Sequence, residues 1–193
     1  MALETEKILA GYFSGTALEL VITHGALVAC LASRIGENLN LQKDEAAFLK
    51  EAAMLHDIGI CRVYAPDICM HGNAPYITHG VIGRKILEDE GLPRHALVSE
   101  RHIGVGLTLQ DIVERNLPLP KRDMTPQNIP EEIICFADLF YSKNPKKLKC
   151  MKNISEIRDA LAIYGKNKVA VFERWLDHYG KKLFTADGRV KQW

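Results

Sequence analysis

Residues 52–59 read AAMLHDIG, so His56 and Asp57 stand side by side at the end of an apolar run, just ahead of Gly59. Imidazole and carboxylate are both metal-ligand types, and burying them is costly unless each finds a partner. The apolar period predicts a helix over residues 44–57, and Gly59 suits a left-handed stop shortly after its end. The pair is therefore predicted to project inward from a helix C-terminus.

Helical periodicity continues along most of the chain, and no segment shows convincing strand alternation. The expected fold class is therefore all-α. Because no repeat or linker divides the sequence, we expect a single domain over residues 1–193, with a core of about residues 15–145 and a C-terminal helical extension of about residues 146–193. A long loop is expected before residue 129. Besides the helix over 44–57, the periodicity predicts helices over residues 16–34, 77–90, 94–103, a short one after 107, one that begins at Pro130, and two over 154–164 and 168–179.

Composition limits the partners that this chain can have. The 193 residues are 47% hydrophobic, enough for one domain with a substantial core, and the formal net charge of +1 gives no overall attraction to nucleic acid or an anionic membrane. Five cysteines without a Cys-x-x-Cys pair favour free thiols in a reducing compartment. No signal peptide and no run of membrane-spanning length is visible, so we expect a cytoplasmic protein, monomer or homodimer, with neither nucleic acid nor membrane as a partner.

Four further ligand-type residues lie in other apolar segments: His24, His79, His102 and Asp138. Taken singly, a histidine on an apolar helix face is more often a hydrogen-bonded core residue than a ligand, and a buried aspartate could equally cap a helix or pair with an arginine. Six such residues, each on the apolar face or at an end of a predicted helix, are hard to explain as independent structural coincidences. They predict a metal site without thiolates, whose ligands suit Fe, Mn, Zn, Ni or Co.

The order of His24, the doublet His56-Asp57 and the later Asp138 resembles the HD-domain phosphohydrolase superfamily over roughly residues 15–145. The AAMLHDIG stretch resembles its HDIG branch. The resemblance implies an HD-domain helical bundle in which these four residues hold one metal ion.

Two more histidines, His79 and His102, stand between the doublet and the last aspartate. Their positions resemble the six-ligand binuclear branch, which includes the diadenosine tetraphosphate hydrolases. The resemblance implies two divalent metal ions, Fe or Mn before Zn, Co, Ni or Mg, with Asp57 as the bridge and the two extra histidines on the second ion.

Two adjacent metal ions lower the pKa of a bound water and neutralise a phosphoryl group under attack. The resemblance therefore implies a metal-dependent phosphohydrolase that cleaves a phosphoester or phosphoanhydride of a small, nucleotide-like substrate. Asp57 and Lys143 are the expected catalytic residues, the lysine because family members often carry a basic residue soon after the final aspartate. The expected substrate contacts are Lys143, Arg62, Arg101 and His71. For each of the three cations a solvated or ion-paired side chain is at least as good an interpretation, and for His71 a solvated side chain is the better one.

Other interpretations stay open. The six-ligand HD scaffold also occurs in mixed-valent di-iron oxygenases that act on small alcohols or phosphonates, and nothing in the ligand set excludes this activity. A noncatalytic binding module is disfavoured because all six ligand positions are retained. His95 and His178 have no partner pattern. A solvated face, rather than a nucleotide or RNA site, is the favoured interpretation of five lysines: Lys143, Lys146, Lys147, Lys149 and Lys152.

Overall fold

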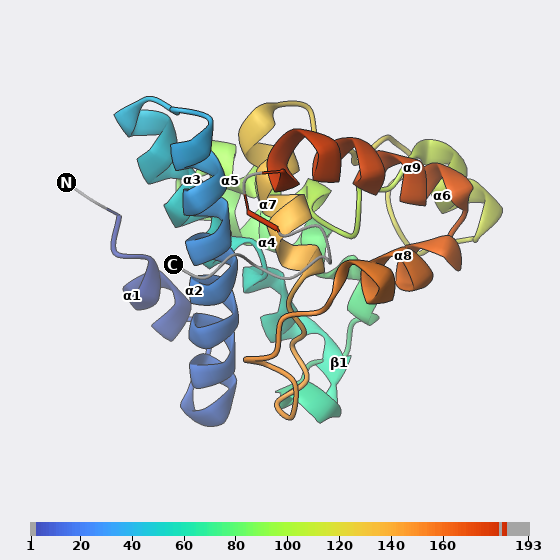
Figure 1. The fold of residues 1–193 in the computed structure, drawn as a ribbon. Coiled ribbons are helices and arrows are strands. Elements are labelled where there is room, and N and C mark those ends of the chain that lie inside the picture. Colours follow the sequence, from blue (N-terminus) through green and yellow to red (C-terminus); the bar gives the residue numbers. More distant parts are fainter. Residues whose placement is uncertain (1–2, 182, 185–193) are drawn as a thin grey trace.

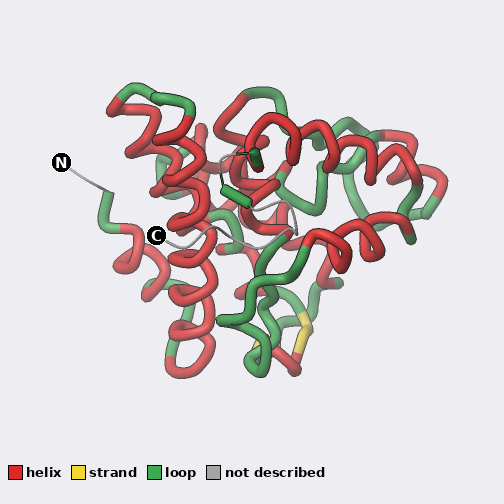
Figure 2. The backbone as a smooth tube through the Cα atoms, in the orientation of Figure 1, coloured by secondary structure: helices red, strands yellow, loops and turns green. Residues whose placement is uncertain are grey.

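The computed structural model describes residues 3–181, 183 and 184, and these form a bundle of helices, as the sequence predicts (Figures 1 and 2). The α-helices in this part of the chain are α1 (Thr5–Ala10), α2 (Gly15–Asn38), α3 (Lys43–Leu55), α4 (His79–Asp89), α5 (Pro93–Arg101), α6 (Leu109–Glu114), α7 (Ile129–Leu139), α8 (Ile154–Ala162) and α9 (Lys166–Trp175).

Short elements connect the helices. Three 3-10 turns, η1 (Ile58–Arg62), η2 (Pro66–Ile68) and η3 (Tyr76–Thr78), lie between α3 and α4, and a π-helical turn, η4 (Leu176–Gly180), extends α9. The antiparallel strands β1 (Tyr64–Ala65) and β2 (Met70–His71) form a small hairpin in the same connection. This hairpin was not predicted, because two-residue strands are too short to show an alternating pattern, and the all-α class is confirmed.

The long helix α2 packs against α3 and α7, while α4 and α5 pack against each other (Figure 1). The buried side of α2 carries apolar residues at helical spacing, and one histidine, His24, interrupts them. Because α3, α5 and α7 also contact one another, residues distant in sequence meet at the centre of the bundle.

By length and composition, α2 would also be long and apolar enough to cross a membrane. The expectation that no run reaches this length was therefore wrong for α2. Core helices of soluble proteins pass the same test, and α2 packs against α3 and α7. The cytoplasmic location stays a prediction.

The C-terminal helices pack on α7 through aromatic side chains. Phe172 of α9 stacks on Phe136 with ring centroids 5.7 Å apart, and Phe184 stacks on Phe140 at 5.0 Å. All four side chains are buried. Phe172 and Phe184 thus share an apolar core with the helix that carries Asp138, whereas the organisation of the whole chain as a single domain stays a prediction.

A buried ion pair fastens α9 to the loop that follows α5. The ammonium of Lys168 donates to the carbonyl oxygen of Gly106 at 2.8 Å and to Asp111 Oδ2 at 2.5 Å. Burial opposes ionisation of Asp111, but Lys168 and the capping residue Thr108 outweigh it and lower the pKa of the carboxyl.

Gly59 has a different role from the expected left-handed stop. It lies within η1 and is absent from the glycines of positive φ among the described residues. A Cβ at this position would come within 1.9 Å of the carbonyl oxygen of His79 and 2.4 Å of the amide nitrogen of Gly83. Glycine is therefore required because the turn after the His-Asp pair approaches the backbone of α4 closely.

Candidate metal centre

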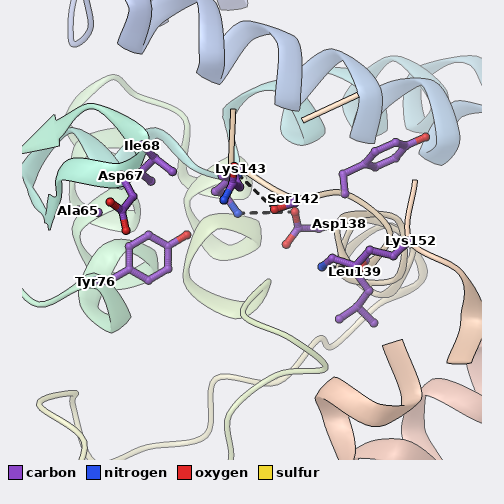
Figure 3. Close-up of a pocket in the computed structure, with 11 residues that line it drawn as sticks. Ala65, Asp67, Ile68, Tyr76, Asp138, Leu139, Ser142, Lys143 and Lys152 are labelled. Carbon is purple, nitrogen blue, oxygen red and sulfur yellow. Dashed lines mark hydrogen bonds and ion pairs between the residues drawn. The ribbon is translucent and has the colours of Figure 1, made fainter. Parts of the chain in front are cut away.

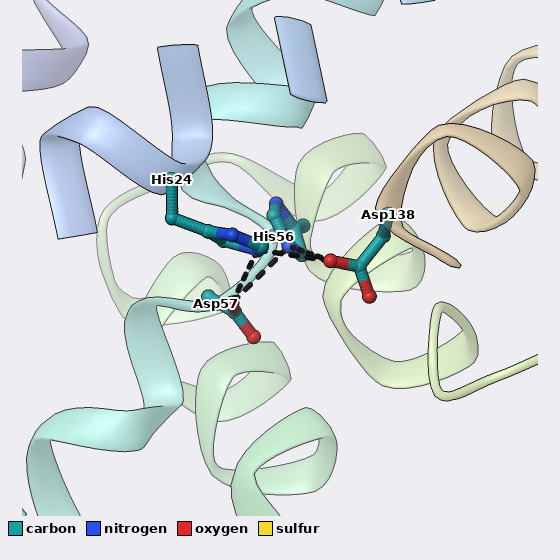
Figure 4. Close-up of side chains that lie close together, drawn as sticks. All are labelled: His24, His56, Asp57 and Asp138. Atoms are coloured by element: carbon teal, nitrogen blue, oxygen red, sulfur yellow. Dashed lines mark hydrogen bonds and ion pairs between the residues drawn. The ribbon is translucent and has the colours of Figure 1, made fainter. Parts of the chain in front are cut away.

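The six ligand candidates converge from five segments of the chain. His24 comes from the middle of α2, His56 and Asp57 from the junction of α3 with η1, His79 from the first turn of α4, His102 from the end of α5 and Asp138 from α7. Figure 4 shows four of them pointing toward one another from different helices. Apart from Asp138, which is partly exposed, all are buried.

Four side chains form the first ligand group: His24, His56, Asp57 and Asp138. His24 Nε2 lies 2.9 Å from Asp138 Oδ1 and 3.3 Å from Asp57 Oδ2. His56 Nε2 lies 3.2 Å from the same oxygen of Asp57 and 3.5 Å from Asp138 Oδ1. Two imidazole nitrogens and two carboxylate oxygens therefore face a common point.

Asp57 also belongs to a second group, with His79 and His102. The other oxygen of its carboxylate, Oδ1, lies 3.5 Å from His79 Nε2 and 3.3 Å from His102 Nε2. The two imidazole nitrogens are 3.1 Å apart. Asp57 thus presents one oxygen to each group.

Backbone carbonyls set the orientation of three imidazole rings. The Nδ1 atoms of His56, His79 and His102 lie 2.6, 2.7 and 2.7 Å from the carbonyl oxygen three residues earlier in the chain. Because a carbonyl only accepts, each Nδ1 must carry the proton, which leaves Nε2 of the neutral ring with a lone pair. This arrangement is typical of histidines whose Nε2 binds a metal ion.

The side chains fit a bound cation better than they fit one another. Two lone pairs would face each other between His79 and His102, unless one ring were protonated, and burial lowers the pKa of His79 to about 3. Oδ1 of Asp57 and Nε2 of His56 are buried without a hydrogen-bond partner, whereas Oδ2 of Asp57 has the ammonium of Lys143 at 2.8 Å. Unpaired buried polar atoms are costly, and a divalent cation in each group would satisfy them.

Lys143 adds a positive charge at the edge of the first group. Its ammonium lies 2.8 Å from Asp57 Oδ2 and 3.7 Å from Asp138 Oδ1, and the side chain is only 14% exposed. Burial opposes ionisation of both carboxyls, but Lys143 outweighs it and holds the pKa of Asp57 and of Asp138 well below the usual range. Conversely, burial lowers the pKa of Lys143, but the two carboxylates raise it well above its usual value.

His56 responds to the same carboxylates. Burial lowers its pKa, but Asp57 and Asp138 outweigh this effect and raise it to about 10. Since a metal ligand must be deprotonated, a cation that enters the first group has to displace a proton from this ring.

An open pocket of about 390 Å³ borders the first group at Asp138 and Lys143. Figure 3 shows the hydroxyl end of Tyr76 directed toward Lys143 on one side and Lys152 beside Leu139 on the other. The residues that line this pocket are Ala65, Asp67, Ile68, Tyr76, Asp138, Leu139, Tyr141, Ser142, Lys143, Asn144 and Lys152.

The other expected substrate contacts lie elsewhere. The guanidinium of Arg101 donates to both oxygens of Glu131 at 2.9 and 3.0 Å, an ion pair between α5 and α7. Arg62 and His71 are exposed, in η1 and β2, and neither lines the pocket at the metal centre. Their roles in substrate binding stay predictions, and the structure brings only Lys143 of the four to the ligand groups.

Three residues of the site were not predicted to be functional: Tyr76 and Ser99 were not singled out, and Lys152 was assigned to a solvated face. Tyr76 and Lys152 line the pocket, and Ser99 donates from Oγ to the carbonyl oxygen of His56 at 2.7 Å, which ties α5 to the end of α3. None of them is a ligand type in an apolar period. The one sequence signal for Tyr76 was its position three residues before His79, because that spacing lets its carbonyl oxygen accept a hydrogen bond from the imidazole of His79.

Comparison with known proteins places this site in a family. The family model of the HD domain matches residues 21–142, which include all six ligand candidates. The chain belongs to the HD-domain family. Two structures of the HD domain of the L. monocytogenes phosphodiesterase PgpH share the fold. The one in complex with cyclic-di-AMP has a TM-score of 0.52 at 16% identity, and the match covers 92% of this chain and 86% of that chain. The other has a TM-score of 0.53 at 13% identity, and the match covers 91% of this chain and 86% of that chain.

Among sequence relatives of this HD-domain chain, an uncharacterized protein of Methanocaldococcus jannaschii is 37% identical over 95 residues, 49% of this chain and 48% of that protein. A tRNA (cytidine(56)-2'-O)-methyltransferase of Thermoplasma volcanium is 31% identical over 143 residues, 74% of this chain and 37% of the methyltransferase. The chain spans about half the length of the first relative and little more than a third of the second. The methyltransferase name therefore describes a much longer protein.

Proposed function

We propose that this chain is a metal-dependent phosphohydrolase that holds two divalent metal ions and cleaves a phosphoester or phosphoanhydride of a small, nucleotide-like substrate. His24, His56 and Asp138 would hold the first ion, His79 and His102 the second, and Asp57 would bridge them through its two oxygens. HD-family membership and the phosphodiesterases among its structural neighbours support the hydrolase activity.

One observation carries the proposal of two ions. Oδ2 of Asp57 faces the first histidine pair, whereas Oδ1 faces His79 and His102, whose Nε2 atoms stand 3.1 Å apart with their Nδ1 atoms committed to carbonyls. A single cation in the first group would leave these two lone pairs unsatisfied. This arrangement supports a cation in each group.

When bound, two metal ions lower the pKa of water and neutralise the charge of a phosphoryl group. In the hydrolysis a water oxygen would bond to phosphorus as the water releases a proton to solvent, the bond from phosphorus to the leaving oxygen would break, and that oxygen would take up a proton from solvent. Lys143, at the mouth of the pocket, would bind a non-bridging oxygen of the phosphoryl group and stabilise the charge that grows on it. The backbone contacts of the imidazoles keep the ligands in place without rearrangement.

A small nucleotide is the substrate class that the site supports best. The pocket combines the cationic Lys143 with the ring of Tyr76 and with apolar side chains, and its volume is at the low end of small-molecule sites. One structural neighbour, the HD domain of a phosphodiesterase, was solved in complex with the nucleotide cyclic-di-AMP. Fe and Mn are the first metals to test, followed by Zn, Co, Ni and Mg, since imidazole and carboxylate ligands accept all of them.

Elemental analysis of the purified chain and a phosphate-release screen test this proposal together. The protein is stripped with a chelator, reloaded separately with Mn, Fe, Co or Ni, and incubated without oxygen with nucleoside monophosphates, polyphosphates and dinucleotides. We expect two ions per chain and metal-dependent release of phosphate or nucleotide. One ion per chain at saturation would disprove the binuclear site, and no hydrolysis with any metal would disprove the hydrolase.

The same preparation separates hydrolysis from oxygenation. An oxygenase would need iron and would consume dioxygen, whereas a phosphohydrolase works under anaerobic conditions and often with manganese.

A further inference from the structure

The pocket beside the metal centre has a second lysine that the metal ligands and the proposed attack do not use. After α7 the chain leaves at Tyr141 and returns at Lys152, whose amide nitrogen donates to the carbonyl oxygen of Phe140 at 2.8 Å. The Lys152 ammonium donates to the carbonyl oxygen of Leu139 at 3.2 Å. These two hydrogen bonds hold Lys152 at the C-terminal end of α7, where it binds Leu139, the residue that follows Asp138.

Lys152 differs from the exposed lysines of the same run. Lys146, Lys147 and Lys149 are exposed, whereas Lys143 and Lys152 are partly buried and line the pocket. The expectation of one solvated basic face was therefore wrong for these two residues. Lys143 and Lys152 thus form part of the pocket wall, while the three lysines between them are in solvent.

A purely structural role leaves the charge of Lys152 poorly compensated. A lysine near a helix C-terminus is favourable because it binds the last carbonyls, and Lys152 does so. Among the described residues, however, its ammonium makes this single hydrogen bond and no ion pair, although it has three donors. Burial lowers the pKa of Lys152, and the neighbouring Lys143 lowers it further, while Asp138 opposes both.

Asp138 lies between the two lysines in Figure 3. Lys143 already contacts Asp57 and lies within 4 Å of Asp138, so its charge is compensated by the ligand carboxylates. In the described part of the chain, the charge of Lys152 has no such carboxylate and is therefore available to bind an anion that enters the pocket. An anion there would lie next to the phosphoryl group held at the metals.

We infer that Lys152 binds a second phosphoryl group, adjacent to the one attacked, and that the substrate is a nucleotide containing a diphosphate unit. This inference rests on the proposed function. The opposite wall of the pocket carries Tyr76, Ile68 and Ala65, whose aromatic and apolar side chains offer a surface for the nucleoside part, beside the carboxylate of Asp67. A nucleoside polyphosphate or a dinucleotide joined by a polyphosphate has this combination of groups.

Binding of two small probes to the manganese-loaded full-length chain tests the inference. Isothermal titration calorimetry compares methylenediphosphonate, which cannot be hydrolysed, with inorganic phosphate. We expect Lys152→Ala to weaken binding of methylenediphosphonate about tenfold, as for the loss of one charged hydrogen bond, and to leave phosphate binding unchanged. Lys152→Arg should retain the binding, and Lys149→Ala, the exposed control in the same run, should change neither.

Equal weakening for both probes would overturn the inference, since it would assign Lys152 to the attacked phosphoryl group or to the end of α7. No weakening, or equal affinity of the wild type for the two probes, would also overturn it. If the wild type hydrolyses simple monoesters or diesters yet shows such results, only this inference fails. If no phosphoester is hydrolysed with any metal, the proposed function fails, while the titrations still report on Lys152.

Discussion

Gly59→Ala should damage both the fold and the second ligand group, because Gly59 is where the His-Asp turn and α4 approach each other. The new Cβ would lie 1.9 Å from the carbonyl oxygen of His79 and 2.4 Å from the amide nitrogen of Gly83. Real Cβ atoms essentially never approach a heavy atom within 3.0 Å, so the two backbones must separate by about 1 Å. Neither atom can rotate away, since both belong to the main chain.

The expected magnitude follows from this rigidity. Overpacking of a core costs roughly 1–3 kcal/mol, and we expect the upper end, about 3 kcal/mol of the free energy of unfolding, because no side chain can yield. The same movement separates His79 from Asp57, whose facing atoms are 3.5 Å apart. The second metal ion should therefore bind about 10–100-fold more weakly, as when the support of a ligand is lost.

Urea denaturation of the metal-free protein measures the stability, and titration with manganese followed by elemental analysis measures the two affinities. Gly11→Ala is the matched control: its Cβ would have one neighbour, the carbonyl oxygen of Ile8 at 3.2 Å, and φ is an ordinary −73°. We expect it to stay within about 0.5 kcal/mol of the wild type. A Gly59→Ala protein as stable as this control, with two tightly bound ions, would refute the close approach.

Four further substitutions probe the site and its attachment. Asp57→Asn should weaken both metal ions, because each oxygen faces a different ligand group; two ions per chain after dialysis would contradict a bridge. His79→Ala should leave one ion of two, and elemental analysis that finds neither would mean that the groups are not separate. Lys143→Met should keep the metals but slow phosphate release about 100-fold, which a colorimetric phosphate assay measures; an unchanged rate would remove Lys143 from the reaction. Asp111→Asn should lower the free energy of unfolding by about 2 kcal/mol at pH 7, because Lys168 loses its buried partner. Because folding lowers the pKa of Asp111, its ion pair contributes to stability above pH ~4, and this contribution is lost as the pH falls through the pKa of the folded state. Urea denaturation at acidic pH should therefore show a smaller difference in stability between Asp111→Asn and the wild type. A difference that stays constant with pH would count against the ion pair.

Much of the fold was predictable because its signals are local. The bounds of the predicted helices agree with α2, α3, α4 and α5 to within a few residues, since apolar period, glycine and proline act within one helix. The helix α1 was missed, because six residues are too few to show a period. The role of Gly59 was misjudged for a different reason: its neighbour in space, α4, is twenty residues away in sequence.

The sequence by itself determined the ligand types, the helices that carry them and their inward faces, because a helical period fixes which residues share a side. Only the tertiary structure decided how those faces are rotated toward one another. Packing of α2, α3 and α7, and of α4 and α5 against the end of α3 and η1, set the two oxygens of Asp57 toward separate histidine pairs. It also paired Arg101 with Glu131 and brought Lys143 and Lys152, but not the lysines between them, to the pocket. These choices depend on contacts between residues distant in sequence, which no local pattern encodes.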